Sequence, residues 1–182
     1  MRLKEMILPV RQLSVFVCVI FLLVTLATQA HTAEYESAFS PGDALPLVLK
    51  AIHSAQTSIH VAAYSFTSRP VAEALTAAFK RGLEVRVIAD AKANSGKYTA
   101  VTYLTNQKVP VRLNSKYAIH HHKFIIVDGK TVQTGSFNYS ASAVSKNAEN
   151  VLVVWNAFDL ARQYEEEWKR LWEEGIDVQP KY

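Results

Sequence analysis

Cysteine is almost absent from this sequence of 182 residues, which contains only Cys18. A single thiol excludes an intrachain disulfide framework and a zinc site built from several cysteines. Cys18 lies in an apolar stretch that we expect to be removed from the mature protein. The mature domain would then have no thiol, which excludes thiolate catalysis and suits an oxidising compartment.

Apolar runs are short, and the longest one lies near the N-terminus. A short, net-positive segment at 1–11 precedes an almost wholly apolar segment at 13–27, and small residues follow up to Ala30. This is the layout of a secretory signal peptide. The alternative is an uncleaved membrane anchor, but a spanning helix needs about 20 apolar residues. We expect cleavage near Ala30, a signal peptide at 1–30, and a periplasmic or secreted domain at 31–182 without stable membrane insertion.

A strong net charge is also lacking. The formal net charge of the whole chain is +4, and removal of the signal peptide, with Arg2, Lys4, Arg11 and Glu5, lowers it to +2. A balance this mild does not by itself predict binding to nucleic acid. A basic groove would require local clustering of lysine and arginine.

Hydrophobic periodicity changes repeatedly between strand and helix along the mature chain. Residues 31–39 have little pattern and are expected to form a flexible arm, before a turn at 40–43. Expected strands are 57–65, 84–89, 109–113, 123–127, 131–134 and 149–155. Expected helices are 44–55, 69–81, 97–106, 140–145 and a last helix capped by Asn156, with Phe158, Ala161, Tyr164, Trp168, Leu171 and Trp172 facing inward. This order predicts one α/β domain per chain, with a mixed β-sheet flanked by helices on both faces.

Three of the six histidines are consecutive, directly before an apolar strand. Residues two apart share a face of a strand, so His120 and His122 point to one face and His121 and Lys123 to the other. One interpretation is a zinc site on His120 and His122, although two ligands are too few for a closed site. A simpler one is that these two side chains pack or form hydrogen bonds at the strand entrance.

The other face of the same strand suggests phosphate chemistry. A neutral His121 imidazole is a competent nucleophile toward phosphorus, and Lys123 would supply positive charge for phosphate oxygens. Ser136 and Asn138 are again two apart and add hydrogen-bond donors. Glu149 opens the next strand, where a carboxylate could accept the proton of the second ring nitrogen of His121.

These residues have a spacing that resembles the full signature of the phospholipase D superfamily, also called the HKD family. In length, leader and single motif, the chain is similar to the small secreted bacterial nucleases of that family. The resemblance implies a phospholipase D-like α/β sandwich and hydrolysis of phosphodiesters without a metal or another cofactor. The matching positions are His121-x-Lys123-x4-Asp128-x6-Gly135-Ser136-x-Asn138.

The resemblance also implies a role for each matched residue. His121 would attack phosphorus and form a covalent phosphohistidine. Lys123 and Asn138 would bind the non-bridging oxygens and the charge of the transition state, with assistance from Ser136. Glu149, which lies outside the core signature at a position where the family often has an acid, would orient His121.

Asp128 and Gly135 are supporting positions of the signature. Strand parity places Asp128 off the face of His121, and Asp128-Gly129 is also a hairpin signal. Whether Asp128 serves the site or the turn remains open at this level.

Family chemistry uses two histidines, one as the nucleophile and one as the general acid. The chain has no second His-x-Lys pair, because His31, His53 and His60 are each followed by other residues. The resemblance and the single motif together imply a homodimer, in which two copies of His121 meet in one shared site.

The signature specifies phosphodiester chemistry but not the substrate. Four lysines are expected near the site, and their charge favours nucleic acid as the substrate. The alternative is that these lysines form only a solvated rim, since lysine is usually exposed. We expect a DNA endonuclease that cuts single and double strands with little sequence preference. The alternative is a phospholipase D acting on phospholipid or cardiolipin head groups, and a third hypothesis is a non-catalytic anion-binding module. The four lysines are Lys92, Lys97, Lys116 and Lys130.

Overall fold

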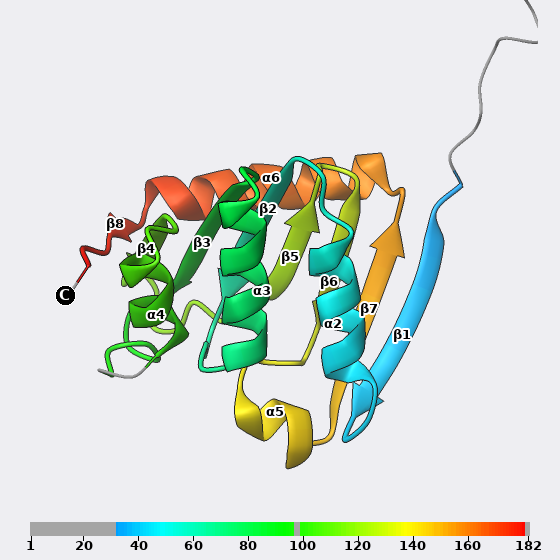
Figure 1. Cartoon of the computed structure of the whole chain (residues 1–182), viewed down its shortest axis with the longest axis horizontal. Helices are drawn as coiled ribbons and strands as arrows, with labels where there is room; N and C mark the ends of the chain where they lie inside the picture. Colours follow the sequence, from blue (N-terminus) through cyan, green and yellow to red (C-terminus); the bar gives the residue numbers. More distant parts are fainter. Residues whose placement is uncertain (1–31, 97–98, 181–182) are drawn as a thin grey trace, which may run out of the picture. The chain divides into compact units, whose positions relative to one another are not determined.

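An eight-stranded mixed sheet is the centre of the computed structural model, which describes residues 32–96 and 99–180 (Figure 1). The predicted signal peptide and Lys97 lie outside the described residues. The strands are β1 Glu34–Ser40, β2 Ser58–Ala63, β3 Glu84–Asp90, β4 Val111–Asn114, β5 Lys123–Val127, β6 Thr131–Gly135, β7 Glu149–Trp155 and β8 Ile176–Asp177. The helices are α2 Ala44–His53, α3 Arg69–Lys80, α4 Ala100–Asn106, α5 Ala141–Ser145 and α6 Phe158–Glu173.

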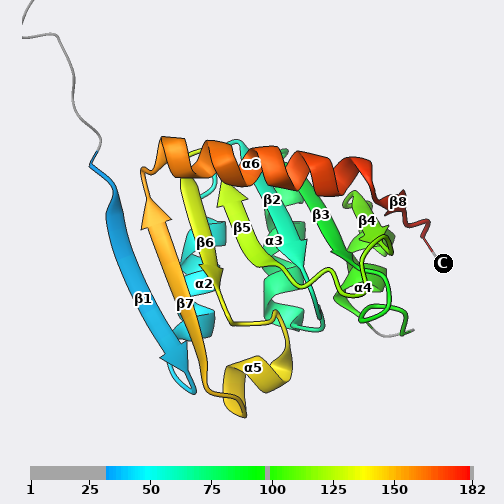
Figure 2. The same ribbon diagram turned by 180° about the vertical axis from the view of Figure 1, so that it is seen from behind.

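The strand order is β1-β7-β6-β5-β2-β3-β4-β8. Strands β2, β3 and β4 pair in parallel, and the other neighbours pair antiparallel. Helices α2 and α3 cover one face, and α6 crosses the opposite face (Figures 1 and 2). Every residue of β5 is buried, because helices cover the central strands on both sides. The predicted mixed sheet with helices on both faces is confirmed.

Helix α6 packs against the sheet through part of its predicted inner stripe. Ala161, Trp168 and Leu171 are buried, and the Trp168 indole donates a hydrogen bond of 2.9 Å to the Val61 carbonyl. One residue of the predicted stripe differs. Phe158 is 50% exposed, since it lies at the first turn of the helix.

No helix within the described ranges is long and apolar enough to span a lipid bilayer.

The start of α6 also differs from the prediction. Ala157, not Asn156, is the N-cap, and no side-chain hydrogen bond caps this end. Asn156 instead has a φ of +53°, in the left-handed region that asparagine tolerates better than most residues. Its function is therefore to turn the chain between β7 and the helix.

The expected flexible arm at 31–39 is the second correction. Residues Glu34–Ser40 form β1, which pairs antiparallel with β7 along its whole length. Ala38 and Ser40 are buried toward α2, whereas Tyr35 and Phe39 are exposed on the other face. An edge strand that buries so few side chains has a weak sequence pattern, although its backbone is fully paired.

Asp128 lies in the β5–β6 turn, at the opposite end of β5 from Lys123. Its carboxylate accepts hydrogen bonds from the backbone N–H groups of Gln56, Thr57 and Ser58, at 2.8 to 3.1 Å. Partial burial acts to raise the pKa of Asp128, but these bonds outweigh it and lower the pKa. This placement supports the structural alternative, in which Asp128 holds the α2–β2 loop against the hairpin.

Candidate active site

Four strand ends converge at one end of the sheet, and all the signature residues except Asp128 lie there. Lys123 begins β5 opposite Ala63 at the end of β2, and Gly135 ends β6 opposite Val151 near the start of β7. The antiparallel register thus joins segments that are separated along the chain. His121, Ser136, Asn138 and Glu149 all lie at or just beyond these ends.

His121 and Lys123 share one face, as predicted from strand parity. The His121 side chain is exposed, whereas Lys123 is buried to 8% exposure, with its ammonium 2.7 Å from the His121 carbonyl oxygen. Loss of water around Lys123 lowers its pKa, and the charge of nearby Glu149 opposes that shift. A poorly hydrated cation beside an accessible imidazole is suited to binding a phosphate.

The close approach of β6 to β7 explains the glycine of the signature. Gly135 has a φ of +148°, and an added Cβ would lie 2.2 Å from the Asn150 carbonyl oxygen. No larger side chain fits there without movement of the backbone. The next residue, Ser136, accepts a hydrogen bond of 3.0 Å from the Asn150 N–H. Gly135 therefore allows β7 to hold the segment that carries Ser136 and Asn138.

Glu149 contacts Ser136 and not His121. The Ser136 hydroxyl donates to the Glu149 carboxylate at 2.6 Å, and the Asn147 amide donates to it at 2.9 Å. No hydrogen bond among the described residues joins Glu149 to the His121 ring. The predicted orientation of His121 by Glu149 is therefore not seen within one chain, where Glu149 holds Ser136 and acts on Lys123 through its charge.

Asn138 follows Ser136 on the same side of the segment. Phe137 and Tyr139, which alternate with them, are fully buried, and the Tyr139 hydroxyl donates to the Gln133 side chain at 2.8 Å. The Asn138 side-chain oxygen is buried and has no hydrogen-bond partner in the described part of the chain. The two buried aromatic side chains thus fix the segment that carries Ser136 and Asn138.

His120 and His122 lie on the other face, with ring centroids 5.5 Å apart. Both ring nitrogens of His120 are buried without a partner among the described residues, and its exposure is 2%. Burial, reinforced by the charge of His122, lowers the pKa of His120 to about 4. Within residues 32–96 and 99–180, no three His, Cys, Asp or Glu side chains are grouped to hold a metal, so the zinc interpretation lacks a third ligand.

Three buried or half-buried residues at this end of the sheet were missed by sequence reasoning. Tyr64 follows β2, and its ring lies 4.6 Å from that of His121. Asp90 ends β3 and accepts a hydrogen bond of 2.8 Å from the His120 N–H. The Asn94 amide donates to the Tyr64 carbonyl at 2.6 Å and to that of Asp90 at 2.8 Å. The sequence signal that could have found them is the presence of polar residues at or just after the ends of β2 and β3, which are neighbouring parallel strands.

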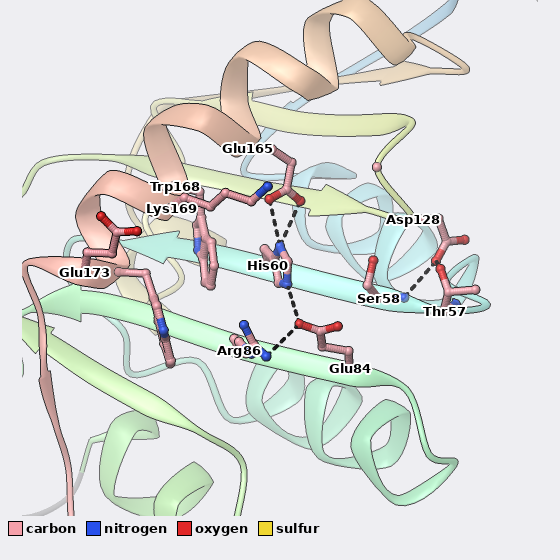
Figure 3. A pocket seen from close by; sticks show the side chains of 12 residues that line it. Thr57, Ser58, His60, Glu84, Arg86, Asp128, Glu165, Trp168, Lys169 and Glu173 are labelled. Carbon is pink, nitrogen blue, oxygen red and sulfur yellow. Dashed lines mark hydrogen bonds and ion pairs between the residues drawn. The ribbon is translucent and has the colours of Figure 1, made fainter.

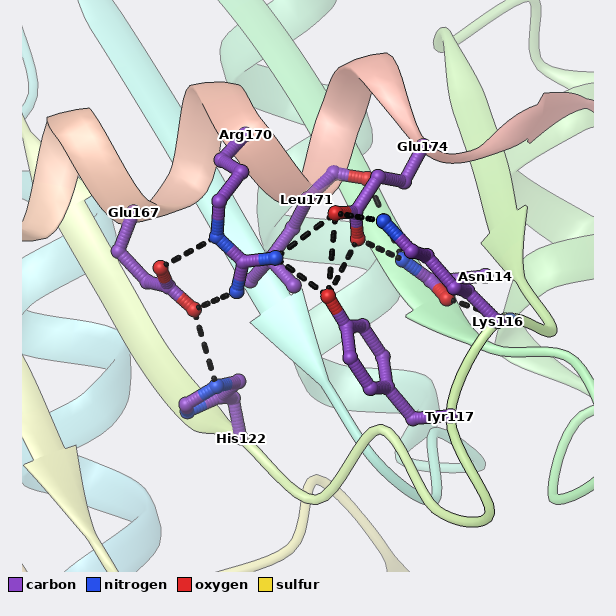
Figure 4. Close-up of polar contacts among 8 residues, drawn as sticks. All are labelled: Asn114, Lys116, Tyr117, His122, Glu167, Arg170, Leu171 and Glu174. Carbon is purple, nitrogen blue, oxygen red and sulfur yellow. Dashed lines mark hydrogen bonds and ion pairs between the residues drawn. The ribbon is translucent and has the colours of Figure 1, made fainter.

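The loop that leads to His121 is tied to α6 by a charged network (Figure 4). The Tyr117 hydroxyl lies between Arg170 and Glu174 and contacts both. Glu174 also accepts a hydrogen bond of 2.7 Å from Lys116, which lowers the pKa of Glu174 to about 2. These contacts connect the helix on one face of the sheet to the loop before the nucleophile.

The predicted substrate-binding lysines separate into different environments. Lys92 is exposed after β3, at the end of the sheet that carries the signature. Lys116 is engaged with Glu174. Lys130 lies in the β5–β6 turn, at the opposite end of β5 from Lys123, and therefore does not line the same site within one chain. This position corrects the expectation that all four lysines surround the motif.

A shallow cavity surrounds His60 at the other end of β2 (Figure 3). The His60 ring stacks on Trp168 at 4.1 Å, and its two nitrogens face Glu165 at 2.8 Å and Glu84 at 3.3 Å. These contacts join β2, β3 and α6. The cavity is also lined by Asp128, which lies at the opposite end of β5 from Lys123, so it is separate from the site around His121 and Lys123.

With this geometry established, comparison with known proteins identifies the family. Residues 48–172 match the family described as "Cardiolipin synthase, PLD-like domain", and the chain belongs to the phospholipase D superfamily. A phospholipase D of Rickettsia conorii is 34% identical over 128 residues, and the mitochondrial cardiolipin hydrolase of Mus musculus is 33% identical over 130. The matches cover 70% and 71% of this chain but 64% and 58% of those relatives, which is less than two thirds of their length.

Two solved structures resemble the chain over most of its length. Nuc from Salmonella typhimurium, described as a phospholipase D family member, is 43% identical with a TM-score of 0.80. The match covers 81% of this chain and 99% of Nuc. NucT from Helicobacter pylori is 28% identical with a TM-score of 0.70, covering 80% of this chain and 100% of NucT. The open mixed sheet and its helices therefore have the α/β fold of Nuc.

The buried, unpartnered His120 leads to a prediction about acid stability. Its ordinary pKa of about 6.5 applies to the unfolded chain, so folding excludes a proton that the unfolded state binds as the pH falls. We expect this residue to reduce the free energy of unfolding progressively below pH 6.5, by about 3 kcal/mol once the pH is below 4. Urea unfolding of wild type and His120→Gln between pH 7 and 4 measures the difference.

The exposed His53 provides the matched control, because His53→Gln should show the same acid dependence as wild type. An acid dependence of His120→Gln equal to that of wild type would contradict the prediction.

Proposed function

We propose that this protein is a metal-independent phosphodiesterase that cuts single- and double-stranded DNA through a covalent phosphohistidine on His121. The observation that carries the proposal is the grouping of His121, Lys123, Ser136 and Asn138 at converging strand ends. Membership of the phospholipase D superfamily supports the phosphodiester chemistry, and the solved relatives named Nuc and NucT support a nucleic-acid substrate.

The chemistry proceeds in two displacements at phosphorus. A ring nitrogen of His121 attacks, an N–P bond forms, and the P–O bond to the leaving group breaks. A general acid protonates the leaving oxygen. Water then attacks phosphorus, loses its proton to the same group, and the N–P bond breaks to release the product and His121. Lys123 and Asn138 bind the non-bridging oxygens in both steps.

Among the residues that the structure describes, one chain supplies one histidine with the required surroundings. His120 is buried and His122 lies on the opposite face, so neither reaches the side that carries His121 and Lys123. The partner subunit's His121 is the proposed general acid, in a homodimer with one shared site on its two-fold axis. Lys123 and its counterpart then provide the positive charge that a metal would otherwise supply.

DNA as the substrate is supported by the accessibility of the site and by one exposed lysine at the same end of the sheet. The nucleophile and Ser136 are exposed, so they can reach a phosphate in a polymer backbone. Lys92 is exposed at the same end of the sheet. Contacts to phosphates alone carry little sequence information, which is consistent with cleavage of many sequences.

A phospholipid or cardiolipin head group is the second candidate substrate. The curated relatives are named phospholipase D and mitochondrial cardiolipin hydrolase, and the family description refers to cardiolipin synthase. The same His121 chemistry serves either phosphodiester.

The predicted signal peptide supports a periplasmic or secreted location for the domain at 31–182. A nucleolytic activity there would act on DNA outside the cytoplasm. The mature chain would contain no cysteine, in keeping with an oxidising compartment.

Cleavage of plasmid DNA by the purified mature protein in excess EDTA tests the proposed activity. Wild type is expected to convert supercoiled plasmid to nicked and linear forms, and His121→Ala should be at least about 1,000-fold slower because it lacks the nucleophile. His53→Ala, at an exposed histidine of α2, should match wild type.

Each alternative result has a defined meaning. Cleavage that requires added zinc or magnesium would revive the metal interpretation of His120 and His122. No cleavage of DNA under any condition, with hydrolysis of cardiolipin vesicles, would transfer the proposal to lipid substrates. Full activity of His121→Ala would remove His121 as the nucleophile.

The shared site predicts the behaviour of mixed dimers. Differently tagged wild-type and His121→Ala chains can be co-expressed and the heterodimer isolated. Because the one site needs both histidines, the heterodimer should have close to no activity. Retention of about half the wild-type activity, or a fully active monomer in light scattering, would show that each chain carries its own complete site.

A further inference from the structure

Within one chain, Glu149 makes no hydrogen bond to the ring of His121, the proposed nucleophile. His121 is exposed at the end of a loop, and no hydrogen bond to its ring is present among the described residues. Its ring contact is Tyr64, with centroids 4.6 Å apart and planes at 60°. Edge-to-face pairs of this kind are the favoured aromatic geometry at separations of about 4.5–7 Å. Tyr64 therefore restricts the rotation of an otherwise free imidazole.

Tyr64 also contacts the second motif residue. The Lys123 ammonium lies 5.4 Å from the centroid of the Tyr64 ring and donates to the His121 carbonyl oxygen. The face of an aromatic ring attracts a cation, most strongly where water is excluded. One aromatic ring thus touches both side chains that the signature assigns to attack and phosphate binding.

The backbone of Tyr64 is itself firmly held. Asn94, which is 3% exposed, donates to the Tyr64 carbonyl at 2.6 Å and accepts from the Phe66 N–H at 3.0 Å. Ala63 and Phe66, on either side, are fully buried. The ring is therefore presented from a rigid strand end, as a positioning group requires.

We propose that Tyr64 is a positioning residue, whose ring sets the orientation of the His121 imidazole and of the Lys123 ammonium for attack on phosphorus. The inference rests on the proposed role of His121 and is independent of whether the diester belongs to DNA or to lipid. The aromatic ring performs this function and the phenolic hydroxyl is not required, because the contacts to His121 and Lys123 are made by the ring.

The test compares Tyr64→Leu, Tyr64→Phe and the control Tyr35→Leu, which replaces an exposed tyrosine on β1. With bis(p-nitrophenyl) phosphate as the substrate, Tyr64→Leu should lower kcat by about 10- to 100-fold, with KM little changed, since misorientation acts on the attacking step. Tyr64→Phe should restore kcat to near the wild-type value, and Tyr35→Leu should equal wild type. Thermal unfolding of each variant confirms that the compared proteins are folded.

Nuclear magnetic resonance of the His121 ring adds a readout that does not depend on turnover. The ring current of Tyr64 should shift the His121 signals, so these should move in Tyr64→Leu and stay near their wild-type positions in Tyr64→Phe. Unchanged kcat or unchanged His121 signals in Tyr64→Leu would overturn the proposal. So would a Tyr64→Phe variant as impaired as Tyr64→Leu, because the hydroxyl would then be the active part.

If wild type does not hydrolyse the diester, the proposed function fails, whereas the ring contact is still decided by the His121 signals. The two failures are therefore distinguishable.

Discussion

The close pairing of β6 with β7 at Gly135 is the constraint on which the site depends. The β7 carbonyl of Asn150 occupies the space that any side chain at position 135 would need. This contact places Ser136 against Glu149 and Asn150. On the opposite side of the site, β2 pairs with β5 and brings Tyr64 to His121 and Lys123. The geometry of the proposed site thus depends mainly on strand register.

The electrostatics of the site follow from the same arrangement. Lys123 begins a strand covered on both faces, so its ammonium is poorly hydrated. Phosphate oxygens could replace its contact with the His121 carbonyl oxygen. Glu149 balances that charge from the neighbouring strand. The two histidines beside the nucleophile lie on the opposite face, where His120 is held neutral by burial. Of the three consecutive histidines, His121 is therefore exposed beside Lys123, whereas His120 and His122 lie on the opposite face.

Much of this arrangement could be predicted from the sequence, because buried strands and a spaced signature are strong local signals. The bounds of β5 and β7 agree with the predicted ranges, and parity placed His121 with Lys123. Strand β1 was missed because an edge strand is defined by backbone pairing more than by its side chains. The roles of Tyr64 and Asn94 depend on contacts between distant segments, which no periodicity records. For the same reason the sequence did not show that Glu149 contacts Ser136, rather than His121, within one chain.

The central claim is that His121 forms a covalent bond to phosphorus, and trapping of that intermediate tests it most directly. The mature protein can be mixed with excess substrate, quenched in alkali within milliseconds to seconds, and digested for mass spectrometry under conditions that preserve phosphohistidine. The account predicts an adduct on the peptide that contains His121, present in wild type and absent from His121→Ala. An adduct on another residue, or turnover by wild type with no adduct at any time point, would contradict it.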